Sequence, residues 1–165
     1  MKEIRFLVNS MLGKLVRFLR IFGYDSIYAN DLEEYFHESP VQDENLLLFA
    51  IKENRMVITR DYPFHINTSG RSVYLEGEGV YNYLKQLKNK LNLNYDFNME
   101  NARCSLCNSE LEKVDNKDLI KEKVQTETFR HYNEFFLCQN PNCKNVYWKG
   151  THIENLLNKL KEKVE

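Results

Sequence analysis

The chain has 165 residues, of which 42% are hydrophobic and 28% are charged, a composition that excludes an intrinsically disordered protein. Its 23 Lys and Arg residues nearly balance its 24 Asp and Glu residues, and a formal net charge of -1 argues against non-specific wrapping of duplex DNA. No apolar run reaches the roughly 18 residues of a membrane span, and no signal-peptide pattern opens the chain, so we expect a cytoplasmic protein without a membrane partner.

The first hundred residues alternate short apolar runs with segments in which apolar residues recur at helical spacing. Strands are predicted at residues 4–8, 26–29, 56–59 and 73–75, and helices at residues 11–22, 43–51 and 80–91. The acidic and aromatic stretch at 30–42 is expected to form a loop. This alternation predicts an α/β fold with a parallel sheet and helices on both of its sides.

Cysteine usage divides the chain, because all four cysteines lie between residues 104 and 143. They form two close pairs, Cys104 with Cys107 and Cys138 with Cys143. Two such pairs on two tight turns supply the sulfurs of a tetrahedral zinc site, which would be structural because it leaves no position open for substrate. The residues that can take the left-handed conformations of such turns are Asn108, Asn140 and Asn142.

Two points stay open in this segment. The cysteines could form two disulfides instead of a metal site, although reduced thiols are expected in the cytoplasm. His152 is interpreted either as a surface histidine or as an RNA contact, since four sulfurs already saturate zinc.

The organisation that follows has three parts. Residues 1–92 form the α/β domain, and a polar connector leads to a cysteine-containing unit at 101–152. Residues 153–165 form a C-terminal amphipathic helix, whose apolar face is expected to dock on the rest of the protein.

Polar side chains are expected to gather where the parallel strands end. Asn9 follows the first predicted strand, Asp61 follows the third, and Asp43 opens the helix that leads into the third strand. Clustered carboxylates suit Mg²⁺ or Mn²⁺, whereas acids that open helices are also ordinary dipole caps. The further acids that could join the cluster or remain solvated are Glu44, Glu76 and Glu78, and those interpreted as turn residues are Asp25 and Asp31.

A row of basic residues follows the first strand. Lys14, Arg17 and Arg20 are spaced by three residues, which places them on one face of the predicted helix, opposite its apolar stripe. This face either contacts RNA phosphates or is an ordinary solvated helix face.

Three segments together resemble the Mut-seven C-terminal RNase family. They are the opening run from Phe6 to Asp25, Thr59-Arg60-Asp61 preceded by Asp43, and the cysteine unit that ends in Tyr147-Trp148-Lys149-Gly150-Thr151-His152. The resemblance implies a PIN-like nuclease domain followed by a zinc ribbon. It also implies a metal-dependent ribonuclease whose acidic positions fall on Asn9, Asp43 and Asp61. Asn9 departs from the pattern, because the family usually has Asp there, and the amide removes one negative charge from the site.

Two functions are therefore considered. The first is a Mg²⁺- or Mn²⁺-dependent ribonuclease that hydrolyses RNA phosphodiester bonds, with water as the nucleophile and a structural zinc ribbon that aids RNA binding. The second is a catalytically impaired PIN-like module that binds RNA or a ribonucleoprotein, with a protein partner on the ribbon. The expected RNA contacts are Ser10, Lys14, Arg17, Arg20, Arg60, Lys149 and His152.

Overall fold

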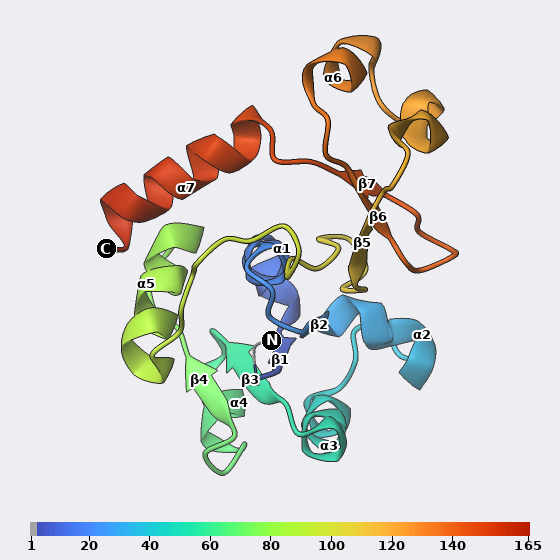
Figure 1. Cartoon of the computed structure of the whole chain (residues 1–165). Coiled ribbons are helices and arrows are strands. Elements are labelled where there is room, and N and C mark those ends of the chain that lie inside the picture. The colour runs from blue at the N-terminus through green and yellow to red at the C-terminus, as the bar shows by residue number, and fades with distance from the viewer. Residues whose placement is uncertain (1–2) are drawn as a thin grey trace.

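A four-stranded parallel sheet organises the first part of the chain in the computed structural model, which describes residues 3–165 (Figure 1). Its strands are β1 (Phe6–Val8), β2 (Ser26–Tyr28), β3 (Met56–Thr59) and β4 (Ser72–Tyr74). They lie in the order β2-β1-β3-β4, with Leu7 opposite Ile27 on one side and Val57 on the other. The predicted parallel α/β fold is confirmed.

Helices cover both faces of this sheet, as predicted. One layer contains α1 (Gly13–Ile21), α5 (Val80–Leu91) and α7 (Thr151–Lys163). The other contains α3 (Asp43–Glu53), α2 (Glu33–Phe36) and α4 (Tyr62–Ile66). Because β1 is central, it is buried on both sides: Phe6 and Val8 pack into the first layer, and Leu7 packs into the second.

Three short helical segments beside the parallel sheet were not expected. The stretch predicted as a loop at 30–42 contains a 3₁₀ turn, Ala29–Leu32, followed by α2, because Ala29 and Leu32 are buried against the sheet. Helix α4 follows β3 directly and is capped by the side chain of Asp61. Each segment is too short to display a helical period in the sequence, so periodicity could not reveal it.

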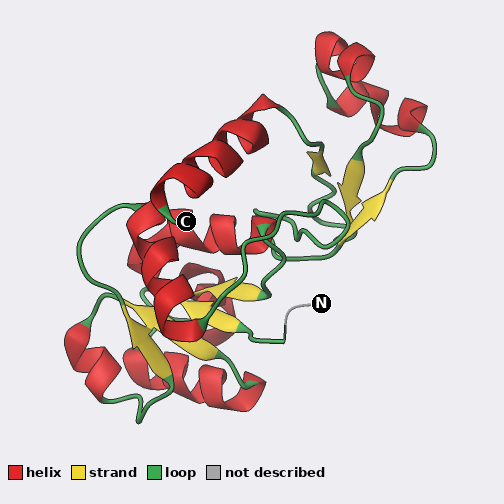
Figure 2. Ribbon diagram, turned by 60° about the vertical axis from the view of Figure 1, so that its left-hand side comes forward, coloured by secondary structure: helices red, strands yellow, loops and turns green. Residues whose placement is uncertain are grey.

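The cysteine unit folds around a small antiparallel sheet that extends away from the parallel one (Figure 2). Its strands are β5 (Leu111–Lys113), β6 (Phe136–Cys138) and β7 (Val146–Tyr147). Between β5 and β6 lie a 3₁₀ helix, Lys117–Lys123, and α6 (Thr126–His131). Ile120, Phe135 and Val146 form its core, with Trp148 packed against them. We call residues 101–152, the range predicted for this unit, the ribbon.

The chain returns to the parallel sheet after the ribbon. Helix α7 begins two residues before the predicted start at Ile153 and packs beside α5 (Figure 1). Its Leu156 and Leu160 enter the same core as Phe6. The expected docking of this amphipathic helix is therefore observed.

A set of buried polar contacts joins the ribbon to the parallel sheet. The Asn108 side chain accepts a hydrogen bond from the Ser26 backbone N–H at 3.0 Å and donates one to Asp25 Oδ1 at 2.7 Å. Asn108 has a φ of 73°, the left-handed conformation expected for an asparagine in this turn. Its amide thus fixes the Cys104–Cys107 turn against the start of β2.

Arg20 joins the same boundary from α1. Its side chain is 3% exposed and donates hydrogen bonds to the carbonyls of Ser26 and Ser105 at 2.9 and 3.0 Å, and it also pairs with Asp31 at 3.4 Å. The expectation that Arg20 lies on an exposed basic face is wrong. Its neighbour on that face, Arg17, is exposed.

Asp25 balances a group of arginines at this boundary. It pairs with Arg55, which is 4% exposed, at 2.7 Å, with Arg5 at 3.4 Å and with Arg103 at 4.0 Å. Partial burial alone would raise the pKa of Asp25, but hydrogen bonds from Arg55 and Asn108, together with nearby positive charge, outweigh burial and lower it. Asp25 is an ion-pair centre rather than the simple turn residue expected from the sequence.

Among residues 3–165, no helix has the length and apolar character that crossing a membrane requires.

We predict that Asp25→Asn lowers the free energy of unfolding by about 3 kcal/mol at pH 7, because the buried Arg55 guanidinium loses its nearer counter-charge and keeps only the half-exposed Glu53 at 3.6 Å. Urea denaturation measures this difference. The ionised Asp25 stabilises the fold above its unfolded pKa of about 3.9, and this contribution is lost as the pH falls through the lowered folded pKa. The gap between wild type and variant should therefore narrow below about pH 4.

The control is Asp115→Asn, which changes an exposed aspartate of the ribbon and should cost less than about 0.5 kcal/mol. Equal effects of the two variants, or a gap that does not depend on acid pH, would contradict the role assigned to Asp25.

Candidate functional site

The carboxyl edge of the parallel sheet brings together the residues expected there. Asn9 follows the last residue of β1, and Asp61 lies two residues beyond β3. Asp43 is the first residue of α3, the helix that leads into β3, so the start of this helix lies at the same edge. We call Asn9, Asp43 and Asp61 the edge site.

Asn9 is held rigidly in this site. It is 7% exposed, and its Oδ1 accepts a hydrogen bond from the Ser10 backbone N–H at 2.7 Å, which caps the 3₁₀ turn Ser10–Leu12. Its Nδ2 donates to Thr59 Oγ1 at 3.0 Å. Both the oxygen and the nitrogen of the amide therefore have protein partners. The second lone pair of Oδ1 faces the Ser10 hydroxyl, whose oxygen lies 3.3 Å away.

Thr59 connects Asn9 to Asp61. Its buried hydroxyl accepts hydrogen bonds from Asn9 Nδ2 and from the Asp61 backbone N–H, each at 3.0 Å. Asp61 then caps α4, because its Oδ1 accepts from the Phe64 N–H at 3.1 Å. Sequence reasoning missed the role of Thr59, although its position at the end of a predicted strand, two residues before Asp61, was an available signal.

The two carboxylates of the edge site influence each other electrostatically. Burial raises the pKa of Asp43, and the negative charges of Asp61 and Glu44 raise it further. The Asp43 carboxylate thus lies close to other negative charges, and a divalent cation would offset their repulsion. Oxygen donors from two carboxylates and one amide suit Mg²⁺ or Mn²⁺, so the residues present fit such an ion.

Other acids do not complete a cluster of three carboxylates here. Within residues 3–165, the cysteines are the only group of three or more His, Cys, Asp or Glu side chains close enough to share a metal ion. Glu76 and Glu78 are exposed on the loop after β4. Of the three further acids considered, only Glu44 acts on the edge site, through its charge on Asp43.

The four cysteines converge as the sequence predicted. The sulfurs of Cys104, Cys107, Cys138 and Cys143 all lie within 4.8 Å of one another. Cys104 and Cys143 are 3.7 Å apart, and Cys107 and Cys138 are 3.4 Å apart, close to the sulfur spacing of about 3.8 Å implied by a tetrahedron with Zn–S bonds of about 2.3 Å. A disulfide needs about 2.05 Å, and all four thiols are free. The cluster could hold a metal such as zinc.

Neighbouring groups support this cluster. Tyr147 Oη lies 2.9 Å from Cys104 Sγ, and Ser109 Oγ lies 3.3 Å from Cys107 Sγ. The second turn takes its left-handed conformation at Lys144, with a φ of 51°, whereas Asn140 and Asn142, the residues expected to supply it, are not left-handed. Lys144 follows Cys143 as Asn108 follows Cys107, so the two turns share this geometry.

The expected RNA contacts near the edge site differ in accessibility. Lys14 and Arg17 are exposed and line a hollow of about 430 Å³ beside α1. Ser10 is half-buried, and its carbonyl accepts a hydrogen bond from Tyr28 Oη. The Arg60 guanidinium lies over the Tyr83 ring at 5.8 Å.

On the ribbon side, Lys149 and His152 are exposed. The Lys149 ammonium lies over the Phe97 ring at 5.9 Å, and His152 meets Trp148 edge-on. Trp148 itself packs against the ribbon core, so the ring is only partly available to a ligand.

Comparison with known proteins identifies the family. The model of the Mut7-C RNAse domain matches residues 4–160, nearly the whole chain, and the chain therefore belongs to this family. The resemblance stated from the sequence is confirmed, and membership indicates a ribonuclease-like function. The comparisons with curated proteins and with solved structures give no match.

We predict that Asp61→Asn lowers the pKa of Asp43, because it removes the like charge that, of Asp61 and Glu44, raises this pKa more. Carbon-detected NMR titration of the side-chain carboxyls measures the shift, with no divalent salt added. Glu44→Gln should shift Asp43 in the same direction by less, whereas Glu78→Gln serves as the distant control. An unchanged Asp43 titration in Asp61→Asn would show that the two carboxylates are not coupled.

Proposed function

We propose that this member of the Mut7-C RNase family is a metal-dependent ribonuclease that hydrolyses RNA phosphodiester bonds at the edge site. The observation that carries the proposal is the pairing of Asp43 and Asp61 at the carboxyl edge of the sheet, where the charge of one raises the pKa of the other. Like charges held together without a basic partner are typical of a cation site.

The chain's own residues have distinct tasks in this proposal. Asp43 and Asp61 would hold Mg²⁺ or Mn²⁺, with the Asn9 amide oxygen as a neutral third donor. A bound ion would supply Lewis-acid stabilisation of the charge that develops on the phosphoryl oxygens. Thr59 positions Asn9 and Asp61 relative to each other through its two hydrogen bonds.

Basic residues around the edge site would bind the RNA backbone. Lys14 and Arg17 are exposed beside it and form no ion pair with any residue from 3 to 165. Ser10 and Arg60 flank the site itself, while Lys149 and His152 would extend the contact onto the ribbon. Arg20 is removed from this set because it is buried in the boundary.

The second candidate function is an RNA- or ribonucleoprotein-binding module that has lost turnover. Asn9 favours it, because a buried amide with partners at both ends contributes no charge to a cation and has little freedom to reorient. A protein partner on the ribbon belongs to this alternative. The two functions differ in whether the edge site cuts RNA.

We further propose that the cysteine cluster holds a structural zinc ion, since a closed set of four sulfurs offers no open position. The free thiols suit a reducing compartment, so a cytoplasmic location is part of the proposal. The proposed division is a PIN-like domain at 1–92, a zinc ribbon at 101–152 and a terminal helix at 153–165, with α7 completing the core of the first part.

The nuclease function is tested by incubating wild type and Asp61→Asn with a labelled single-stranded RNA pool and Mn²⁺, Mg²⁺ or neither ion. We predict cation-dependent cutting by wild type and a loss of at least about 100-fold in Asp61→Asn, because one of two charged donors is gone. Retained gel retardation without any cutting would instead identify a binding module.

Asn9→Asp provides the matched gain-of-charge variant in the same assay. Under the nuclease proposal it should lower the Mn²⁺ concentration needed for half-maximal cutting, because the site gains a third carboxylate. Cutting that arises only in Asn9→Asp, from an inert wild type, would favour the second function. Equal cutting by wild type, Asp61→Asn and Asn9→Asp would place the activity outside the edge site.

Zinc is tested by metal analysis of the reduced, folded protein, which should contain about one zinc per chain. Cys138→Ser should lose this zinc, and the NMR signals of the ribbon core should lose their chemical-shift dispersion, because so small a core depends on its metal. Its neighbour Gln139→Ser is the control and should keep both. A wild-type zinc content far below one per chain would refute the proposal.

A further inference from the structure

Three hollows follow the boundary between the parallel sheet and the ribbon. The edge hollow, of about 430 Å³, lies between α1 and the Cys104–Cys107 turn and is lined by Lys14, Arg17, Tyr28 and Ser105 among others. The middle hollow, of about 240 Å³, shares Arg17 and Ser105 with it. The ribbon hollow, of about 600 Å³, shares Phe97 with the middle one. Because neighbouring hollows share lining residues, they adjoin one another along the boundary, and we call the three together the depression.

The depression starts beside the edge site. Tyr28 lies at the carboxyl end of β2 and lines the edge hollow, and its hydroxyl donates a hydrogen bond to the carbonyl of Ser10, the residue after Asn9. Gly13, also in the lining, faces the Tyr28 hydroxyl so closely that a Cβ at this position would lie 3.1 Å from it. The edge hollow is therefore connected to the Asn9 end of the edge site through Tyr28 and Ser10.

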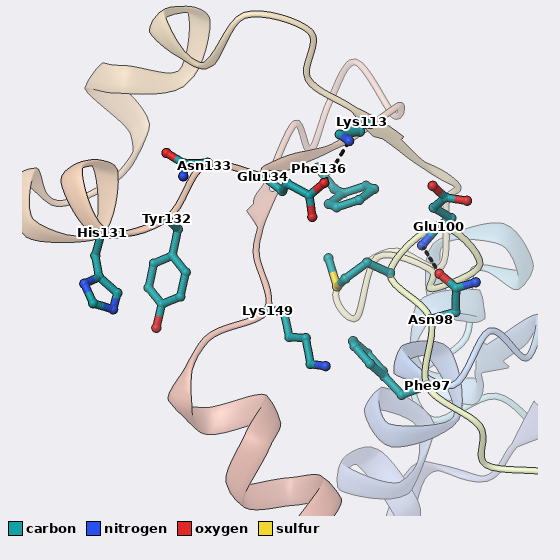
Figure 3. Close-up of a pocket in the computed structure, with 11 residues that line it drawn as sticks. Phe97, Asn98, Glu100, Lys113, His131, Tyr132, Asn133, Glu134, Phe136 and Lys149 are labelled. Atoms are coloured by element: carbon teal, nitrogen blue, oxygen red, sulfur yellow. Dashed lines mark hydrogen bonds and ion pairs between the residues drawn. The ribbon is translucent and has the colours of Figure 1, made fainter.

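The far end combines aromatic rings with amide groups. Figure 3 shows Phe97 and Tyr132 projecting from opposite walls toward the ribbon hollow, with Lys149 between them. Asn98 and Asn133 also line it. Aromatic faces beside hydrogen-bonding amides suit an unpaired nucleobase, which can stack and be contacted along its edge.

The charges along the depression favour a polyanion. Lys14, Arg17 and Lys149 lie along it, and none of them has a carboxylate within ion-pair distance in residues 3–165. In the ribbon hollow, Glu134 is neutralised by Lys113 at 2.9 Å, which leaves Glu100 as the unbalanced acid there. Three cations without a carboxylate partner on one boundary would attract the phosphates of a single strand.

We propose that the boundary is a path for single-stranded RNA, running from the edge site past Lys14 and Arg17 to the ribbon hollow, where an unpaired base stacks and Lys149 contacts its phosphate. The inference rests on the proposed function for the identity of the substrate. To that function it adds the course of the strand along the boundary and a second binding point. It assigns to the ribbon the task of holding the distal part of the strand, which is the part farthest from the edge site.

Fluorescence anisotropy with labelled RNA tests the path, using proteins that carry Asp61→Asn and no added Mg²⁺ or Mn²⁺, so that no RNA is cut. The probes are single-stranded RNAs of about 4 and about 16 nucleotides, the range that such grooves cover. Lys149→Ala should weaken binding of the longer RNA about tenfold and reduce its salt dependence by about one charge, because one phosphate contact is lost. The shorter RNA fits either end and should show a smaller effect.

Lys85→Ala is the matched control, since Lys85 is an exposed lysine on α5 outside the three hollows. Equal weakening by Lys149→Ala and Lys85→Ala would show that the lysines act only through general electrostatic attraction, and it would overturn the proposed path. No effect of Lys149→Ala on the longer RNA would overturn it as well, and would leave the ribbon hollow to a ligand other than RNA.

A second measurement tests the stacked base without altering the protein. Removing the bases from the distal nucleotides of the longer RNA should weaken binding about tenfold at the same phosphate charge, and an unchanged affinity would overturn the stacking site. Failure of the proposed function gives a different result: wild type would bind the longer RNA through Lys149 yet cut nothing with Mn²⁺. Conversely, if RNA cutting were unaffected by every substitution at the ribbon hollow, the proposal of a nuclease would stand and the proposal of an RNA path would be overturned.

Discussion

The buried contact between Asn108 and the start of β2 is the constraint on which the arrangement of the two parts depends. A single amide satisfies the Ser26 N–H and the Asp25 carboxylate, so the cysteine turn is attached to the sheet by polar groups removed from water. Such groups tolerate little displacement, because each unpaired partner would carry a desolvation cost. The cysteine cluster and the edge site are therefore held in one fixed relation.

Arg20 shows how this attachment limits the functional surface. Helix α1 carries three basic residues at regular spacing, and the sequence alone does not distinguish which of them is exposed. The ribbon covers one of them: Arg20 ends at the carbonyls of Ser26 and Ser105, while Lys14 and Arg17 stay exposed. Helical spacing predicts which residues share a face, but only tertiary structure decides how far along that face a second unit lies.

The sequence predicted the sheet well for a physical reason. Parallel strands are buried on both faces, so they appear as short apolar runs between helical periods, and those runs locate β1 to β4 within about two residues. The cysteine cluster was equally predictable from the sequence, because its members come as two close pairs. The contact of Asn108 with Asp25 joins residues far apart in the chain and leaves no local pattern, which is why Asp25 was interpreted as a turn residue.

The edge site was predicted in its members but not in its hydrogen bonding. Thr59 makes the difference, because its hydroxyl accepts from both Asn9 and Asp61 and has one proton left to donate. With Asn9 in place, the Thr59 hydroxyl proton is not needed to join the two residues, because the Asn9 amide and the Asp61 N–H both donate to the Thr59 oxygen. With a carboxylate there, which the resemblance to the family implies at this position, the same hydroxyl could turn and donate to it while still accepting from the Asp61 N–H. The surrounding hydrogen bonds therefore accommodate either side chain, and the charge at position 9 can change without altering the backbone that positions Asp61.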